Sequence, residues 1–195
     1  MEEIREAKSE MRRNMVETIE KLPEDEIVHK NGAIENRLFE FANFLEAAIV
    51  LLYLDRPGEV STGRIIEKCY DFGKMVILPT FNSETGVATL MKVDNIDTDL
   101  APGPRGGLEP AGGKCKVVPI ECIDIAIVPG IAFDEKGCRL GTGDGSYDRL
   151  IPDLPVTTRK VALTLEAQMT PQVPMESHDK HVDIIITDER IIYKI

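Results

Sequence analysis

The sequence contains no tryptophan, few aromatic residues (5%) and only four cysteines among its 195 residues. The absence of tryptophan excludes no class of protein. The cysteines form no C-x-x-C pair, so their spacing suggests neither a zinc site nor a redox motif. Small buried or half-buried thiols without a chemical role are therefore the expected interpretation of Cys69, Cys115, Cys122 and Cys138.

Basic residues are also in the minority. The chain has 23 Lys and Arg against 34 Asp and Glu, a formal net charge of −11. Proteins that bind nucleic acid present a basic face to the phosphates, so we expect no nucleic-acid partner. A small anionic ligand remains compatible with this charge, because a local cluster of Lys, Arg and backbone N–H groups can bind it.

Long apolar runs are missing as well. No run approaches the roughly 20 residues that a membrane span needs, and residues 1–15 are charged where a signal peptide would be apolar. We therefore expect a cytoplasmic protein without a membrane partner. The length and the lack of repeats or linkers predict one domain over residues 1–195, as a monomer or a homodimer.

Apolar residues at three- and four-residue steps predict two helices at the start of the chain. The first has its apolar stripe at Ile4, Met11, Met15, Ile19 and Leu22, and Pro23 ends it. Lys8 and Arg12 lie one turn apart at one edge of this stripe; a solvated helix edge is the alternative interpretation. The second helix is predicted from about Asp25 to Leu45, with Ile27, Ile34, Leu38, Phe41 and Leu45 on its apolar face.

Short, continuous apolar runs then predict strands that are covered on both faces, as in parallel sheets. These runs are residues 47–54, 75–78 (ended by Pro79), 123–128, 159–165 and 182–187. Ser61 or Thr62 is expected to cap a helix between the first two. This alternation predicts an α/β fold with a mainly parallel sheet and right-handed crossovers. Residues 80–117, rich in Gly and Pro, predict a long functional loop with one short strand near 88–93.

The densest chemical signal is residues 128–149, VPGIAFDEKGCRLGTGDGSYDR. Three glycines at alternate positions, Gly141, Gly143 and Gly145, let a backbone turn tightly and point N–H groups at phosphate oxygens. Arg139 and Arg149 flank this loop, and Asp148 could hold the Mg²⁺ that accompanies nucleotide phosphates. A purely structural turn is the alternative. The spacing matches neither a dinucleotide-binding loop nor a P-loop.

The same segment closely resembles the signature of 5-formyltetrahydrofolate cyclo-ligases, also called methenyltetrahydrofolate synthetases. Further blocks follow in the same order along nearly the whole chain. They are Lys8-x-x-x-Arg12, Pro57-Gly58-Glu59-Val60-x-Thr62, Gly106-x-Leu108-Glu109-Pro110 and His178-Asp179-x-x-Val182-Asp183.

The resemblance implies a three-layer α/β/α sandwich and an enzyme, an ATP-dependent ligase. ATP would phosphorylate the formyl oxygen of 5-formyltetrahydrofolate, and ring closure would give 5,10-methenyltetrahydrofolate, ADP and phosphate. The implied roles, position by position, are ATP binding by Lys8, Arg12, Arg139, Gly141, Thr142, Gly143, Asp144, Gly145, Ser146 and Tyr147; folate binding by Leu54, Glu59 and Tyr147; Mg²⁺ binding by Asp148 and Asp179; and catalysis by Tyr147 and Arg149.

Two positions depart from the family pattern. Ser146 stands where the family usually has the first of two tyrosines, so we expect a wider and wetter pocket there. Asp144 stands where Gly or Lys is frequent and adds negative charge near the expected phosphates. These departures keep a second function open, a catalytically weak relative that binds nucleotide or folate as a regulatory module. A different phosphate-ester enzyme on a similar fold is a third.

Other interpretations of single residues also remain open. Glu59 could serve only as a favourable charge at a helix N-terminus, and Asp179 could be a surface loop residue. His178-x-x-His181 with Asp183 could be a metal site, although no fourth ligand is evident for it.

Overall fold

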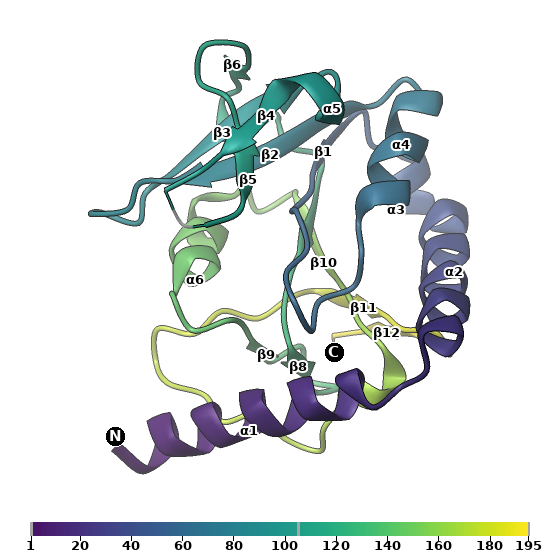
Figure 1. Ribbon diagram of the computed structural model, residues 1–195, viewed down its shortest axis with the longest axis vertical. Helices are drawn as coiled ribbons and strands as arrows, with labels where there is room; N and C mark the ends of the chain where they lie inside the picture. The colour runs from purple at the N-terminus through teal and green to yellow at the C-terminus, as the bar shows by residue number, and fades with distance from the viewer. Residues whose placement is uncertain (1, 105, 195) are drawn as a thin grey trace.

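A computed structural model of the chain describes residues 2–104 and 106–194. In this part, eight strands form one sheet (Figure 1). Their order across the sheet is β12 (Ile191–Tyr193), β11 (Ile184–Ile186), β10 (Arg159–Leu163), β7 (Ile125–Val128), β1 (Ile49–Leu51), β2 (Met75–Phe81), β3 (Ala88–Val93) and β6 (Lys116–Val117). The five neighbours from β11 to β2 pair in parallel. The other pairs are antiparallel: β12 with β11, β3 with β2, and β6 with β3. The predicted, mainly parallel sheet is confirmed.

Helices cover both faces of this sheet. On one face, Val50, Val76 and Ile127 lie in one core cluster with residues of α2 (Glu24–Glu40), α3 (Ala42–Glu46) and α4 (Gly63–Asp71). On the other face, Leu51 and Ile77 share a cluster with residues of α6 (Ser146–Leu150) and the 3₁₀ turn Ile151–Asp153. Figure 1 shows α2, α3 and α4 on one side of the sheet and α6 on the other. The result is the three-layer α/β/α arrangement that the resemblance implied.

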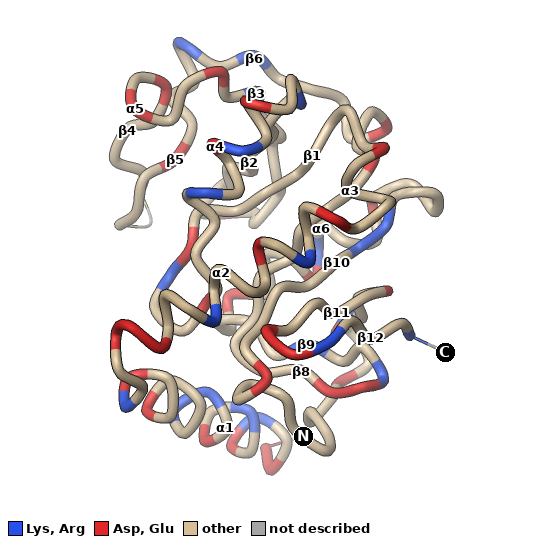
Figure 2. The backbone as a smooth tube through the Cα atoms, turned by 90° about the vertical axis from the view of Figure 1, so that its right-hand side faces the viewer, with Lys and Arg blue, Asp and Glu red and all other residues tan. Residues whose placement is uncertain are grey.

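Helix α1 (Glu2–Glu20) packs elsewhere, along the bottom of Figure 1. Its residue Met15 joins a small core with the hairpin β8 (Ala132–Phe133) and β9 (Arg139–Leu140). Acidic and basic residues are interspersed along this helix (Figure 2). Because the apolar stripe faces the hairpin, the helix holds Lys8 and Arg12 beside the segment that follows β9.

The second predicted helix is interrupted at Phe41. There the backbone is extended (φ −74°, ψ 120°), so α2 ends at Glu40 and α3 begins at Ala42. The change of direction buries Phe44 completely and leaves Leu45 52% exposed. The expectation that Leu45 lies on the buried face was therefore wrong.

Two local expectations about the first strands were also wrong. Pro79 lies inside β2, opposite Leu90 of β3, and does not end the strand. On its other side β2 pairs with β1 only as far as Ile77, so the missing N–H of the proline breaks no ladder bond. Thr62 precedes α4 without capping it, since its hydroxyl donates to the Tyr53 carbonyl.

The segment of residues 80–117 is more regular than expected. The predicted strand is present as β3, and the segment also forms α5 (Ile96–Asp99) and a small sheet of β4 (Leu100–Pro102) and β5 (Leu108–Pro110). Among all the described residues, no helix combines the length and apolar character needed to span a bilayer.

Candidate active site

A cavity of about 470 Å³ lies at the carboxyl ends of β1, β2 and β7. Open parallel sheets bind ligands at this edge. The cavity is lined by the residues after β1 (53–56 and 59), the end of β2 (78, 79 and 81), residues 107–109, Pro129, residues 139–148, three residues of α1 (5, 8 and 12) and residues 176, 178 and 179. The structure thus brings the expected residues Lys8, Arg12, Leu54 and Glu59 to the glycine-rich loop.

The glycine-rich loop, residues 141–145, connects β9 to α6. Gly143 and Gly145 have φ values of 104° and 68°, a region that side-chain-bearing residues avoid. Arg12 lies against this loop: its Nε donates to the Gly141 carbonyl at 2.8 Å, and its guanidinium carbon would be 3.3 Å from a Cβ added at Gly143. Asp144 accepts a hydrogen bond from the Ser146 N–H at 3.0 Å. The loop therefore keeps a fixed shape with a cation beside it.

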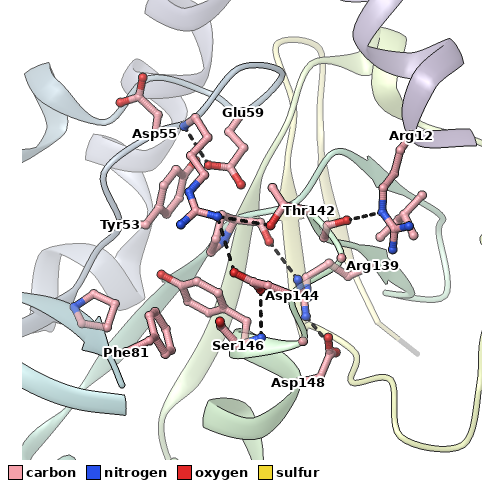
Figure 3. A pocket seen from close by; sticks show the side chains of 18 of the residues that line it. Arg12, Tyr53, Asp55, Glu59, Phe81, Arg139, Thr142, Asp144, Ser146 and Asp148 are labelled. Carbon is pink, nitrogen blue, oxygen red and sulfur yellow. Dashed lines mark hydrogen bonds and ion pairs between the residues drawn. The ribbon is translucent and has the colours of Figure 1, made fainter. Parts of the chain in front are cut away.

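Arg139 is buried beneath the loop and pairs with Asp148. Its Nη2 lies 2.8 Å from Asp148 Oδ1, its Nη1 donates to the Pro129 carbonyl, and its side chain is 2% exposed. The Lys180 N–H also donates to Asp148 Oδ1 at 3.0 Å. Arg139, expected to bind ATP, lines the cavity, and its bond to Asp148 holds that carboxylate in place (Figure 3).

Lys8 pairs with two carboxylates across the cavity wall. Its Nζ lies 2.9 Å from Glu176 Oε2 and 2.5 Å from Asp179 Oδ2. Burial alone would lower the pKa of Lys8, but the hydrogen bonds to Asp179 and Glu176 raise it. Burial alone would likewise raise the pKa of Asp179, but the Glu176 N–H and the Lys8 ammonium lower it. The three groups therefore stay charged over the neutral range.

Glu176 was not identified from the sequence. Within residues 2–104 and 106–194, the one group of potential metal ligands combines Glu176, His178 and Asp179, whose ligand atoms lie within 4.8 Å of one another. Asp148 is outside this group and faces Arg139, although both aspartates line the same cavity. The alternative set with His181 and Asp183 does not come together in the described part of the chain.

Aromatic rings and a carboxyl group form the other half of the cavity. The Tyr147 ring lies 5.5 Å from the ring of Phe81, centroid to centroid, and the two are tilted by 60°. Glu59 is half-buried; burial raises its pKa to about 7, although the Arg56 N–H, 3.0 Å from Oε2, acts in the opposite direction. Phe81 was missed because nothing in its local sequence distinguishes it from a core residue.

Ser146 lies in the wall of the cavity. Its own side chain is only 3% exposed, although it stands among the cavity-lining residues. The wider pocket expected where the family tyrosine is missing stays a prediction.

Arg149, expected to be catalytic, is hydrogen-bonded to the glycine-rich loop. Its Nη2 donates to the Asp144 carbonyl at 2.9 Å and its Nε to the Gly86 carbonyl at 3.5 Å. It is exposed and is not among the cavity-lining residues. These contacts support the shape of the loop, and a catalytic role for Arg149 stays a prediction.

Comparison with known proteins agrees with this arrangement. The sequence matches the 5-formyltetrahydrofolate cyclo-ligase family over residues 4–188. A Caenorhabditis elegans protein named as a probable 5-formyltetrahydrofolate cyclo-ligase is 29% identical, over 99% of this chain and 98% of the relative. The Escherichia coli K12 5-formyltetrahydrofolate cyclo-ligase is 28% identical, over 80% of this chain and 86% of the relative.

The fold is also similar to that of a solved relative. The NMR structure of Aquifex aeolicus 5,10-methenyltetrahydrofolate synthetase superimposes with a TM-score of 0.83 at 29% identity, covering 96% of this chain and 92% of the other. A family match over residues 4–188 and a fold shared with a solved relative lead to one conclusion: this chain belongs to the 5-formyltetrahydrofolate cyclo-ligase family.

Proposed function

We propose that this protein closes 5-formyltetrahydrofolate to 5,10-methenyltetrahydrofolate, with ATP converted to ADP and phosphate. The main support is the combination of two kinds of surface in one cavity. One half is a glycine-rich loop with Arg12 beside it, and the other is the Glu59 carboxyl near the Tyr147–Phe81 pair. An enzyme that joins a nucleotide to a flat, polar heterocycle needs both surfaces within reach of each other.

The first half suits the phosphates of ATP. The backbone N–H groups of residues 141–145 can donate to phosphate oxygens, and Lys8 and Arg12 add positive charge from α1. Asp148 and Asp179 both line this half of the cavity and offer the carboxylate oxygens that Mg²⁺ prefers, and Glu176 offers another beside Asp179. Bound Mg²⁺ would offset charge on the phosphates. Arg139 and Lys8 hold the two carboxylates in place.

The second half suits the folate. An ionised carboxylate can accept hydrogen bonds from two adjacent N–H groups of a pterin, and the Glu59 carboxyl lines the cavity and would make this contact. Leu54 and the ring of Tyr147 offer apolar surface to the heterocycle. These contacts would hold the formyl group against the terminal phosphate of ATP.

The reaction then needs two steps. The formyl oxygen attacks the γ-phosphorus, and the bond to the leaving ADP breaks. N10 of the folate attacks the activated carbon and loses its proton, and phosphate leaves with the former formyl oxygen. The protein contributes mainly by placing the two reactants and by offsetting the charge that develops on the phosphates.

An absorbance assay for the methenyl product tests this proposal. The protein, 5-formyltetrahydrofolate, ATP and Mg²⁺ together should give product, and reactions without ATP or with excess chelator should give none. If no product forms at high protein concentration while nucleotide and folate still bind, the proposal is wrong and the chain acts as a binding module.

A further inference from the structure

Arg56 is a cavity cation that has no part in the roles above. It lies in the segment between β1 and α4, and its side chain is 43% exposed. Its Nη1 lies 3.4 Å from Thr142 Oγ1 and 3.5 Å from Asp144 Oδ2, both in the glycine-rich loop. The guanidinium thus reaches across the cavity to a loop more than 80 positions away in the sequence.

The backbone of Arg56 is held firmly while its side chain is not. The Arg56 N–H donates to Glu59 Oε2, and the Glu59 N–H donates to the Arg56 carbonyl at 2.9 Å. The buried amide of Gln168 donates to the Gly58 carbonyl at 2.7 Å and fixes the same turn. By contrast, the contacts of the guanidinium with the loop are long and partly exposed, and such pairs stabilise a fold little. The side chain can exchange these contacts for a more highly charged ligand.

Three other cations of the cavity are more fully engaged. Lys8 is buried between two carboxylates, and Arg139 is buried against Asp148. Arg12 lies against Gly141 and Gly143, on the α1 side of the loop. Figure 3 shows Thr142 and Asp144 between Arg12 on one side and the Asp55–Glu59 segment on the other. Arg12 and Arg56 therefore approach the glycine-rich loop from two separate segments.

We propose that Arg56 binds the polyphosphate of the nucleotide, on the side of the loop opposite Arg12. This inference rests on the function proposed above. Before the nucleotide binds, Asp144 holds the guanidinium over the loop. Phosphate oxygens carry more charge than one half-exposed carboxylate and fit the planar guanidinium bidentately, so they would take over the contact.

Calorimetric titration with a non-hydrolysable ATP analogue and Mg²⁺ tests this role directly. Arg56→Ala is expected to weaken binding of the analogue about tenfold, the loss typical of one charge-assisted hydrogen bond in a partly exposed site. Arg56→Lys, which keeps the charge without the fork, should fall in between. Arg13→Ala is the matched control, because Arg13 is exposed on α1, outside the cavity lining, and its loss changes the net charge equally.

The dissociation constant of 5-formyltetrahydrofolate, measured with the same variants, should change less than about twofold. The inference is overturned if Arg56→Ala binds the analogue like the wild type, or if it weakens folate binding instead, which would assign the guanidinium to the folate carboxylates. The assay for methenyl product with the wild type tests the proposed reaction independently. If no product forms, the proposed reaction is wrong, but the nucleotide titration still decides whether Arg56 binds the polyphosphate.

Discussion

Replacing Glu59 with glutamine should stabilise the fold at pH 8 and do little at pH 5. Burial raises the pKa of this carboxyl from 4.5 to about 7. Between these two values the folded protein keeps a proton that the unfolded chain loses, so stability falls as the pH rises through this range. Above pH 7 the folded state carries the full cost of an ionised, half-buried carboxylate. Glutamine has nearly the same shape and no such cost.

The size of the effect follows from the two pKa values. A rise from 4.5 to about 7 corresponds to about 3 kcal/mol of unfolding free energy at alkaline pH. The carboxyl keeps some contact with solvent, so we expect a gain of about 2 kcal/mol for Glu59→Gln at pH 8. For a chain of 195 residues this corresponds to a melting temperature higher by about 4–8 °C.

Urea unfolding at pH 5 and pH 8 measures this difference. Glu67→Gln is the control, since Glu67 is exposed on α4 and its replacement should have the same small effect at both pH values. An equal gain for Glu59→Gln at pH 5 and pH 8 would refute the reasoning, because the carboxyl would then titrate like an exposed one.

The same titration should control folate binding. With a pKa of about 7, the carboxyl is about one tenth ionised at pH 6 and about nine tenths at pH 8. If the ionised form accepts the pterin N–H groups, the wild-type affinity for 5-formyltetrahydrofolate should rise about tenfold between these pH values. Glu59→Gln should bind more weakly, with little dependence on pH. A flat wild-type profile would show that another group accepts these hydrogen bonds.

Three further variants test the rest of the cavity. Asp148→Asn should weaken the apparent Mg²⁺ affinity in turnover about 10- to 100-fold and lower stability, because buried Arg139 loses its anionic partner; an unchanged Mg²⁺ titration would remove Asp148 from the metal site. Lys8→Ala should raise the KM for ATP about tenfold. The same variant should lose more of its melting temperature at pH 8 than at pH 5. Without Lys8, the Glu176 and Asp179 carboxylates repel each other at pH 8, whereas at pH 5 they can share a proton; equal losses at both pH values would contradict the two ion pairs of Lys8. Ser146→Tyr should destabilise the fold by about 1–3 kcal/mol without improving folate affinity, because Ser146 is buried and a larger side chain would have to displace its neighbours; Ser146→Ala is its control, and tighter folate binding by the tyrosine variant would show that space is available.

Much of the secondary structure could be predicted from the sequence alone. Continuous apolar runs correctly predicted β7, β10 and β11, because a strand covered on both faces needs apolar residues at every position. Where the prediction failed, the cause was tertiary. Pro79 can stay within β2 only because β1 has already ended beside it, and local sequence does not contain that information.

Several residues of the candidate site could likewise be predicted from the sequence, whereas their contacts could not. Residue types and spacing predicted the glycine-rich loop, and the family pattern pointed to Lys8, Arg12 and Glu59; the structure brings all of them to one cavity. The sequence did not determine their partners. Lys8 meets Asp179 across 171 positions, Arg56 meets Asp144 across 88, and Arg149 meets the Gly86 carbonyl across 63. Periodicity and motifs predict local structure, because they depend on residues that are close along the chain. Which distant side chains pair with a charged residue depends on how the helices pack on the sheet, so only the tertiary structure decides it.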